Sequence, residues 1–284
     1  MLRFMEQTRE FVARDDSHLS VTNWAASEEA GTPRKPLVLL VHGLGEHAGR
    51  YAPLARRLCA AGYPVRAYDH YGHGHSEGPR GGLARDLQLC EHLGEIAAAS
   101  LAEARFTDRS LVLVGHSLGG LVVASAVMRG LVRPALLVMS SPALAVRMAA
   151  WQRAAVGLLP QVWPGLTLGN GLDPRILSHD PQVVANYLAD PWVHDRICAR
   201  LGAFVAFEGE RVRAAAAGWT TPTLLLYAGD DRAVDPAGSR AFATAAPQTV
   251  VHSHCFEAMY HEIFNEPDAG DVLTILERAL AAVA

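Results

Sequence analysis

One serine in this chain stands where it could act as a nucleophile. Ser117 is the centre of the pentapeptide GHSLG at 115–119, which has the form G-x-S-x-G. An apolar run at 111–114 precedes it and another at 120–126 follows it, which predicts a strand, a sharp turn and a helix. In such a nucleophile elbow, small flanking residues let the backbone turn tightly and hold the hydroxyl at the top of a sheet. The expected chemistry is acyl transfer through a serine ester.

A nucleophilic serine needs a general base, and His261 is the histidine whose place in the chain fits. In folds built around this elbow the nucleophile comes first, then an acid, then the histidine. His261 follows the last expected strand, at a loop that leads into the final helix. His252 and His254 stay as rivals, although both fall at or near the end of that strand. The zinc motif H-E-x-x-H is not formed, because Asn265 stands where its second histidine is needed.

The acid is expected directly after the strand that ends at Tyr227. Two adjacent carboxylates, Asp230 and Asp231, stand there, and Asp235 lies further on. Because successive side chains in a turn point in different directions, only one of the pair is expected to reach the imidazole. We predict Asp231 as the acid and Asp230 as a turn residue. The acid would fix the histidine tautomer and stabilise the imidazolium that forms during attack.

The negative charge of the reaction intermediate needs backbone N–H donors. The elbow supplies the amide of Leu118, and the turn HGLGEH at 42–47 supplies that of Leu44. The glycines of this turn are spaced one residue too far apart for the nucleotide motif G-x-G-x-x-G. The histidine-rich stretch DHYGHGHS at 69–76 could hold zinc, but its glycines and its place after a strand favour a structural turn beside the site. We therefore expect no metal and no other cofactor.

The elements that must position these residues alternate along the chain between β-type and helical patterns. This succession predicts a mostly parallel sheet covered by helices on both faces, an α/β fold. The expected strands are His18–Trp24, Leu37–Val41, Val65–Tyr68, Leu111–Val114, Leu136–Met139, Thr223–Tyr227 and Thr249–His252; the expected helices are Tyr51–Ala61, Leu83–Phe106, Leu118–Gly130, Pro236–Ala245 and His261–Val283.

The alternation pauses for nearly eighty residues after Pro142. A structureless loop of that length is improbable in a compact domain, so the sequence predicts an inserted helical cap at 142–217. The core then comprises 1–141 and 218–284. Within the cap, 154–172 carries no charged residue, but prolines and glycines interrupt it too often for a membrane span. We expect an apolar surface element there.

Composition limits the function classes. The chain has 284 residues, half of them hydrophobic, and a net charge of −4, which argues against nucleic acid as a partner. Residues 1–11 carry four charged side chains and lack the apolar stretch of a secretory signal, so a cytoplasmic location is expected. The four cysteines are scattered without C-x-x-C spacing, which favours reduced thiols.

These motifs together resemble the monoacylglycerol lipase and lysophospholipase family of α/β-hydrolases, sometimes grouped as serine aminopeptidase-like. The resemblance rests on HGLGEH (42–47), DHYGHGHSEGPRG (69–81), GHSLGG (115–120), GDDR (229–232) and YHEIFNE (260–266), in the family's order. It extends to the cap phrases LSHDP (177–181) and ADPWVH (189–194). One departure is local, because His70 and Tyr71 stand where arginine, or glutamine with arginine, is common.

The resemblance implies a triad of Ser117, Asp231 and His261, with Leu44 and Leu118 as oxyanion donors. It also implies an apolar acyl-chain tunnel under the cap, for which Trp151, Leu159, Trp163 and Leu166 are candidate lining residues. The expected reaction is cleavage of a carboxylic ester, above all a monoacylglycerol, with transient contact between the cap and a lipid surface.

Other functions stay open at this point. Within ester hydrolysis they are a lysophospholipase and a general carboxylesterase. An aminopeptidase would need acidic side chains in the cap to hold a substrate amine, and six carboxylates stand there, at 173, 180, 190, 195, 208 and 210. A non-catalytic small-molecule receptor on the same scaffold is the alternative outside enzymes.

Overall fold

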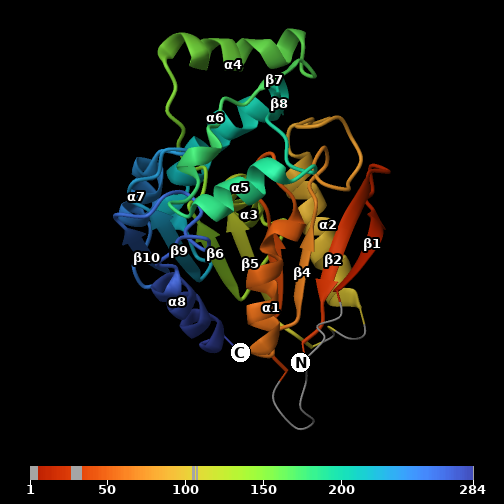
Figure 1. Ribbon diagram of the computed structural model, residues 1–284, viewed down its shortest axis with the longest axis vertical. Coiled ribbons are helices and arrows are strands. Elements are labelled where there is room, and N and C mark those ends of the chain that lie inside the picture. Colours follow the sequence, from red (N-terminus) through yellow and green to blue (C-terminus); the bar gives the residue numbers. More distant parts are fainter. Residues whose placement is uncertain (1–5, 27–33, 104–105, 107, 284) are drawn as a thin grey trace.

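The protein is built around one twisted sheet with helices on both faces (Figure 1). The computed structural model describes residues 6–26, 34–103, 106 and 108–283. The eight strands lie in the order β1-β2-β4-β3-β5-β6-β9-β10. All neighbours from β4 to β10 are parallel, whereas β2 is antiparallel to both β1 and β4. The strands are β1 (Glu6–Val12), β2 (His18–Trp24), β3 (Leu37–Val41), β4 (Val65–Tyr68), β5 (Leu111–His116), β6 (Leu136–Ser140), β9 (Thr223–Ala228) and β10 (Val251–Phe256).

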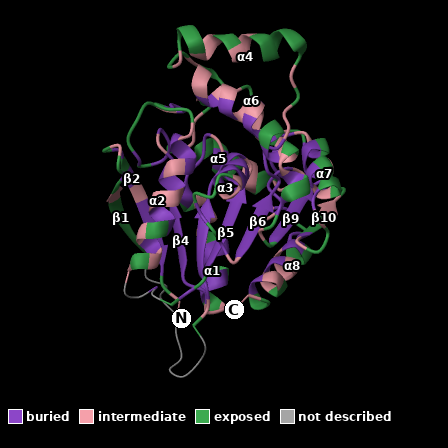
Figure 2. Ribbon diagram, turned by 180° about the vertical axis from the view of Figure 1, so that it is seen from behind, coloured by how far each residue is buried: buried purple, intermediate pink, exposed green. Residues whose placement is uncertain are grey.

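Two apolar layers hold the helices to this sheet. On one face α1 (Ala52–Ala60) and α8 (Gly270–Ala281) pack on the strands. On the other face lie α2 (Gln88–Ala102), α3 (Leu118–Met128) and α7 (Pro236–Ala245). Because both faces are covered, the central strands are buried along their whole length, as Figure 2 shows in purple. The expected mostly parallel α/β sheet is confirmed.

The chain between β6 and β9 forms a separate group of elements beyond one end of the sheet (Figure 1). We refer to this stretch as the inserted segment. It contains α4 (Ala150–Val162), β7 (Thr167–Gly169), the short helix η2 (Pro174–Ile176), α5 (Pro181–Ala189), β8 (Arg196–Cys198) and α6 (Ala199–Ala214). Helix α6 packs on α3 of the core, and α4 packs on α6. Among the described residues, no helix is long and apolar enough to cross a membrane.

Several element boundaries differ from those expected from the sequence. Strand β1 was not expected, because its polar residues are exposed at the sheet edge and carry no apolar pattern. The last strand begins only at Val251, since a turn at Pro247 holds the backbone N–H groups of Val250 and Val251. Helix α2 begins at Gln88 rather than Leu83; the Gln88 side chain accepts from the Ala84 backbone in the preceding turn.

The largest difference concerns the final helix. It was expected from His261 onward, but α8 begins at Gly270 and residues 261–269 form turns instead. Pro267 explains the difference, because it disfavours helical conformation in the residue before it and cannot donate a backbone hydrogen bond inside a helix. His261 is therefore held in an irregular loop.

Candidate active site

Ser117 sits at a strained turn between β5 and α3. Its φ of 54° and ψ of −117° place it in a region that residues other than glycine rarely adopt. The turn is possible because Gly119 lets α3 approach β3: a Cβ on Gly119 would lie 2.1 Å from the carbonyl oxygen of Val41. Backbone strain of this kind concentrates at functional sites and needs support from the surrounding structure. The geometry is that of the nucleophile elbow expected from the sequence.

His261 and Asp231 form a buried pair. The imidazole Nδ1 lies 2.7 Å from Oδ2 of Asp231. Oδ1 of the same carboxylate accepts the backbone N–H groups of Ala233 and Val234, each at 2.9 Å. These bonds fix the carboxylate in one orientation, so the ring of His261 is fixed as well. The two side chains come from different loops, after β9 and after β10.

Each member of this pair perturbs the other's ionisation. Burial alone would raise the pKa of Asp231, but the His261 imidazole and the two backbone N–H groups outweigh it and hold that pKa below its usual value. Burial alone would lower the pKa of His261, but the Asp231 carboxylate raises it above its usual value. The arrangement therefore favours an ionised carboxylate that stabilises the protonated imidazole.

The rival residues lie elsewhere. Asp230 points to the surface, where it pairs with Arg232 at 2.8 Å. His252 and His254 are both exposed on β10 at the edge of the sheet. Asp235 caps the N-terminus of α7 by accepting from Ala237. The structure thus brings Asp231 to His261 and brings none of these residues to that pair.

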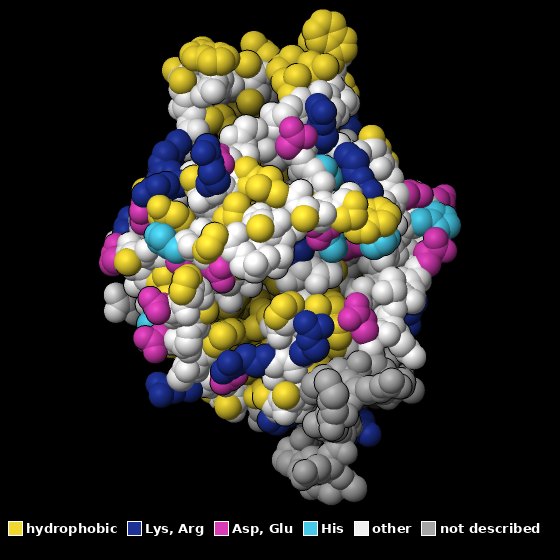
Figure 3. All heavy atoms as spheres, in the orientation of Figure 1, with side chains coloured by type: hydrophobic (Ala, Val, Ile, Leu, Met, Phe, Trp, Pro, Cys, Tyr) yellow, Lys and Arg dark blue, Asp and Glu magenta, His cyan; other side chains and the backbone are white. Residues whose placement is uncertain are grey.

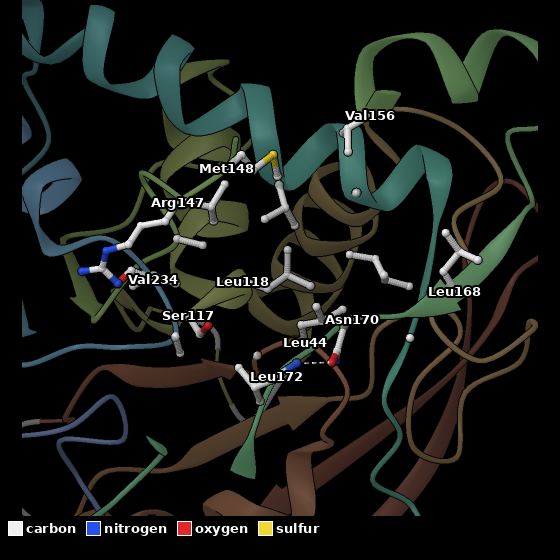
Figure 4. Close-up of a pocket in the computed structure, with 18 of the residues that line it drawn as sticks. Leu44, Ser117, Leu118, Arg147, Met148, Val156, Leu168, Asn170, Leu172 and Val234 are labelled. Atoms are coloured by element: carbon white, nitrogen blue, oxygen red, sulfur yellow. Dashed lines mark hydrogen bonds between the residues drawn. The ribbon is translucent and has the colours of Figure 1, made fainter. Parts of the chain in front are cut away.

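The two expected oxyanion donors flank the serine. Leu44 and Leu118 line the same cavity as Ser117, and in Figure 4 Leu118 lies between the other two. Leu118 is the first residue of α3, where backbone N–H groups have no partner within the helix. The loop that carries Leu44 is tied to the inserted segment, because Gly45 accepts a 2.8 Å hydrogen bond from the His194 backbone. Both amides therefore belong to firmly held backbone.

The histidine-rich turn at 69–76 supports the loop that carries Leu44. Asp69 accepts from the backbone N–H of Ala48 at 2.7 Å and from that of His75 at 2.8 Å. The buried ring of His70 packs 4.4 Å from that of His42, centre to centre. Burial lowers the pKa of His70 well below its usual value, which keeps the ring neutral. Within the described ranges, no three His, Cys, Asp or Glu side chains come together as a group that could hold a metal ion.

A cavity of about 570 Å³ connects the serine with the inserted segment. Ser117 and His261 line it at the core side. Three of the four apolar residues expected to line an acyl tunnel, Trp151, Leu159 and Leu166, also line it, whereas Trp163 does not. Trp163 follows the last residue of α4 and remains 63% exposed. In Figure 4, Val156 of α4 and Leu168 of β7 lie on the side of the cavity away from Ser117.

The lining of this cavity includes a charged cluster around Arg50, which was not predicted from the sequence. Arg50 binds Glu262 through two hydrogen bonds of 2.8 and 2.9 Å and also pairs with Glu46. Its guanidinium lies 4.7 Å from the ring centre of Tyr187 of the inserted segment. Burial alone would raise the pKa of Glu46, but Arg50 and nearby histidines lower it to about 2, so this carboxylate is ionised. The signal in the sequence was the charge carried by the loop of the oxyanion donor Leu44.

The acidic residues of the inserted segment are engaged away from the cavity. Asp173, Asp190, Asp195 and Glu210 each pair with a basic side chain, and Asp180 caps α5. Glu208 is buried against Arg129 and Arg211. Among the described residues, none of these six carboxylates lines the cavity, where the acidic side chains are Glu46 and Glu262, both bound to Arg50.

The cysteines form no disulfide in the structure, and one of them, Cys198, lines the cavity. The four cysteines are unpaired; Cys59, Cys90 and Cys198 are buried, and Cys255 is half-buried. Burial raises the pKa of Cys59 to about 11 and that of Cys90 to about 12, so both remain protonated thiols.

Comparison with known proteins agrees with this geometry. Residues 32–268 match the family described as serine aminopeptidase, S33. A monoacylglycerol lipase of Mycolicibacterium smegmatis is 35% identical over 85% of this chain and 86% of its own, and the rat monoglyceride lipase is 30% identical over 90% and 83%. The crystal structure of a Paleococcus ferrophilus monoacylglycerol lipase superimposes with a TM-score of 0.82 at 34% identity, covering 94% of this chain and 99% of that one. The chain belongs to the serine aminopeptidase S33 family of α/β-hydrolases and is an ester hydrolase.

Proposed function

We propose that the protein hydrolyses monoacylglycerols with Ser117 as nucleophile, His261 as general base and Asp231 as the orienting acid. The observation that carries the proposal is a cavity whose lining combines Ser117 and His261 with mostly apolar side chains and with the charged cluster around Arg50. An ester of a fatty acid and a small polyol has the same division. The named activity of two relatives that each match most of the chain supports the same substrate.

In this mechanism Oγ of Ser117 attacks the ester carbonyl while Nε2 of His261 takes its proton. The backbone N–H groups of Leu44 and Leu118 stabilise the oxyanion. The imidazolium then gives the proton to the departing glycerol oxygen, and in the second half His261 activates water to release the fatty acid. Asp231 stays ionised throughout, in agreement with the direction of its pKa shift.

The charged cluster around Arg50 favours a neutral alcohol over an anionic one. In this cluster Glu46 and Glu262 carry two negative charges against the one positive charge of Arg50. The other arginine that lines the cavity, Arg147, binds the backbone carbonyls of Asp231 and Val234 instead. A phosphate-bearing leaving group would meet a net negative, poorly hydrated surface there, whereas glycerol hydroxyls can hydrogen-bond to the carboxylates. This supports a monoacylglycerol rather than a lysophospholipid as the preferred substrate.

The aminopeptidase alternative has less support. A substrate amine would need an unpaired carboxylate beside the cavity, and the six candidates of the inserted segment are engaged elsewhere. The carboxylates that do line the cavity already bind a guanidinium. A non-catalytic receptor has no need of the strained serine or of the buried acid–base pair.

We extend the proposal to the inserted segment, which we take to be a cap at 142–217 that touches lipid assemblies. Helix α4 has no buried residue, yet it presents large apolar side chains: Trp151 is 72% exposed, Leu158 64% and Val162 66%. Figure 3 shows this apolar group at the end of the molecule, over α4. Such a patch is more than a lone exposed side chain and is typical of a surface that contacts lipid.

A hydrolysis profile tests the substrate. If the apolar lining binds the acyl chain, each added methylene should gain up to ~0.8 kcal/mol until the cavity is full, so kcat/KM should rise with chain length and then fall. Monoacylglycerols from two to eighteen acyl carbons would be compared with lysophospholipids and aminoacyl amides. Leu166→Glu, which charges the lining, should flatten the rise and spare short esters. A flat profile in the wild type, or faster cleavage of aminoacyl amides, would reject the proposal.

A further inference from the structure

The sequence phrase LSHDP lies in the inserted segment, far along the chain from the triad, and the mechanism above gives it no task. In the structure it lies directly against the loop of His261. The backbone N–H of Glu262 donates to the carbonyl of Leu177 at 2.8 Å. The hydroxyl of Ser178 donates to the carbonyl of Asn265 at 2.9 Å. Two backbone positions just after the base are thus held by consecutive residues of the inserted segment.

His179 adds a third attachment through its side chain. Its Nδ1 lies 2.7 Å from Glu266 Oε2, and its backbone N–H donates to Oε1 of the same carboxylate at 2.8 Å. Glu266 is buried, and both of its carboxylate oxygens bind His179. A carboxylate held at both oxygens fixes direction as well as distance.

The ring of His179 also stacks on Tyr260, the residue directly before the base. The ring centres are 3.6 Å apart and the planes differ by 25°. The same Tyr260 ring is contacted by the guanidinium of Arg232, 4.6 Å from its centre, and Arg232 directly follows the acid in the chain. The chain neighbours of the Asp231–His261 pair are therefore joined to each other and to His179.

These contacts matter because the loop itself is irregular. Residues 261–269 lie between β10 and α8 and have no continuous helix or strand to fix them. Such a loop must still keep His261 aligned between Asp231 and Ser117, and a displacement of 1 Å in a catalytic group can cost about 100-fold in rate. External attachment is the way an irregular loop acquires that precision.

We infer that His179 is a positioning residue for the general base: the stretch Leu177–His179 of the inserted segment clamps the loop 260–266 and so holds His261 in its working orientation. The inserted segment then has two duties, covering the substrate and aligning the triad. The inference rests on the proposed function, since it presumes that His261 is the base.

The test measures p-nitrophenyl butyrate hydrolysis, because this short soluble ester makes little use of the apolar lining. His179→Ala should lower kcat about 10- to 100-fold with KM within about twofold of the wild type. His179→Phe keeps a stacking ring and loses the donor to Glu266, and His179→Asn keeps a donor near the place of Nδ1 and loses the ring. Each should recover part of the loss. Arg175→Ala is the matched control and should retain wild-type kcat, because it removes an exposed side chain whose ion pair in the described part of the chain is with Asp173.

A fluorophosphonate separates positioning from mere folding. If His179 aligns the base, the His179→Ala enzyme should still label completely at Ser117, but more slowly, because every molecule carries a weakened base. A lower labelled fraction at the wild-type rate would mean a partly unfolded population and would overturn the inference. So would wild-type kcat in His179→Ala. The double variant His179→Ala/Glu266→Ala should be no slower than the worse single variant, since the two residues act through one contact.

Failure of the proposed function would look different. If Ser117→Ala or His261→Ala kept hydrolysing the ester, the triad assignment itself would fall, whatever His179→Ala did. If both were inactive and His179→Ala alone kept the wild-type rate, the triad would stand and only the clamp would be rejected.

Discussion

Two apolar helices of this protein have opposite fates. Helix α3, LGGLVVASAVM, contains no charged residue, and positions 118–126 are all buried. Helix α4, AWQRAAVGLLPQV, contains one charged residue, Arg153, and none of its positions is buried. Both sequences would favour burial by composition alone. Apolar composition therefore has two roles in this protein: α3 forms the fixed platform behind Ser117, and α4 lies at the surface beside the cavity.

If α3 is the platform of the nucleophile, covalent modification should occur only at Ser117, directly before this helix. A fluorophosphonate should add one adduct to the wild type, and Ser117→Ala should abolish labelling and lower kcat on the order of 10⁴-fold or more. Intact mass and peptide mapping measure the adduct. An adduct on any other residue, α4 included, would break the assignment.

The next largest effect concerns the acid. Asp231→Asn should lower kcat on the order of 10³- to 10⁴-fold with little change in KM, because the amide favours the wrong tautomer of His261. Asp230→Asn is the matched control, since that neighbour pairs with Arg232 at the surface, and it should stay near the wild-type rate. A larger loss at Asp230 would show that the loop adopts a different conformation during catalysis.

The pH dependence of the rate tests the same assignment. His261 must be neutral to accept a proton, and Asp231 raises its pKa, so kcat/KM of the wild type should fall as the pH drops through that raised value. Asp231→Asn removes the main raising influence and leaves burial, which lowers the pKa. The acidic limb of the residual activity should therefore move to lower pH. If the acidic limb stays at the same pH, it reports the ionisation of a group other than His261.

The difference between the helices can also be probed with one methyl group. A Cβ on Gly119 would lie 2.1 Å from the Val41 carbonyl oxygen, so Gly119→Ala must push α3 away from β3 and should cost about 1–3 kcal/mol in the free energy of unfolding, and activity as well. A Cβ on Gly157 of α4 would meet Phe207 at an ordinary 3.6 Å. Gly157→Ala should gain roughly 0.5–1 kcal/mol. Denaturant unfolding of both variants measures the contrast, and equal effects would contradict it.

Sequence patterns predicted the parts of this molecule that depend on local chemistry. The elbow at Ser117 could be predicted because the glycines and the apolar runs that define it lie within about ten residues of the serine. The choice of Asp231 over Asp230 followed from turn geometry, and the structure places Asp231 against His261. The short central strands of the buried sheet were found because their residues are mostly Leu and Val.

Features that depend on distant partners could not be predicted in this way. The ion pairs of Arg50 join the oxyanion loop to the residue after His261, more than two hundred positions away. The clamp by His179 joins the inserted segment to a loop some eighty residues later. Trp163 was expected in the cavity because it is a large apolar residue of the inserted segment, but it does not line the cavity. Whether an apolar residue there faces the cavity or solvent depends on how α4 is rotated on α6. No local pattern encodes that rotation.

The smallest expected effect tests why α4 stays uncovered. Leu158 and Val162 are one turn apart on α4, are largely exposed and do not line the cavity, whereas their neighbour Leu159 does. Leu158→Glu/Val162→Glu should therefore lower kcat/KM on an emulsified long-chain monoacylglycerol by about tenfold, because an apolar helix face loses its affinity for the lipid surface once it is charged. Hydrolysis of soluble p-nitrophenyl butyrate should be unchanged. Leu159→Glu should instead lower kcat/KM on long-chain substrates to the same extent whether they are emulsified or dissolved in detergent, because Leu159 lines the cavity. Co-sedimentation with phosphatidylcholine vesicles would show whether the double variant has lost binding. An equal loss on soluble and emulsified esters would mean that α4 matters through the cavity alone, and the two apolar helices would then differ in burial without differing in purpose.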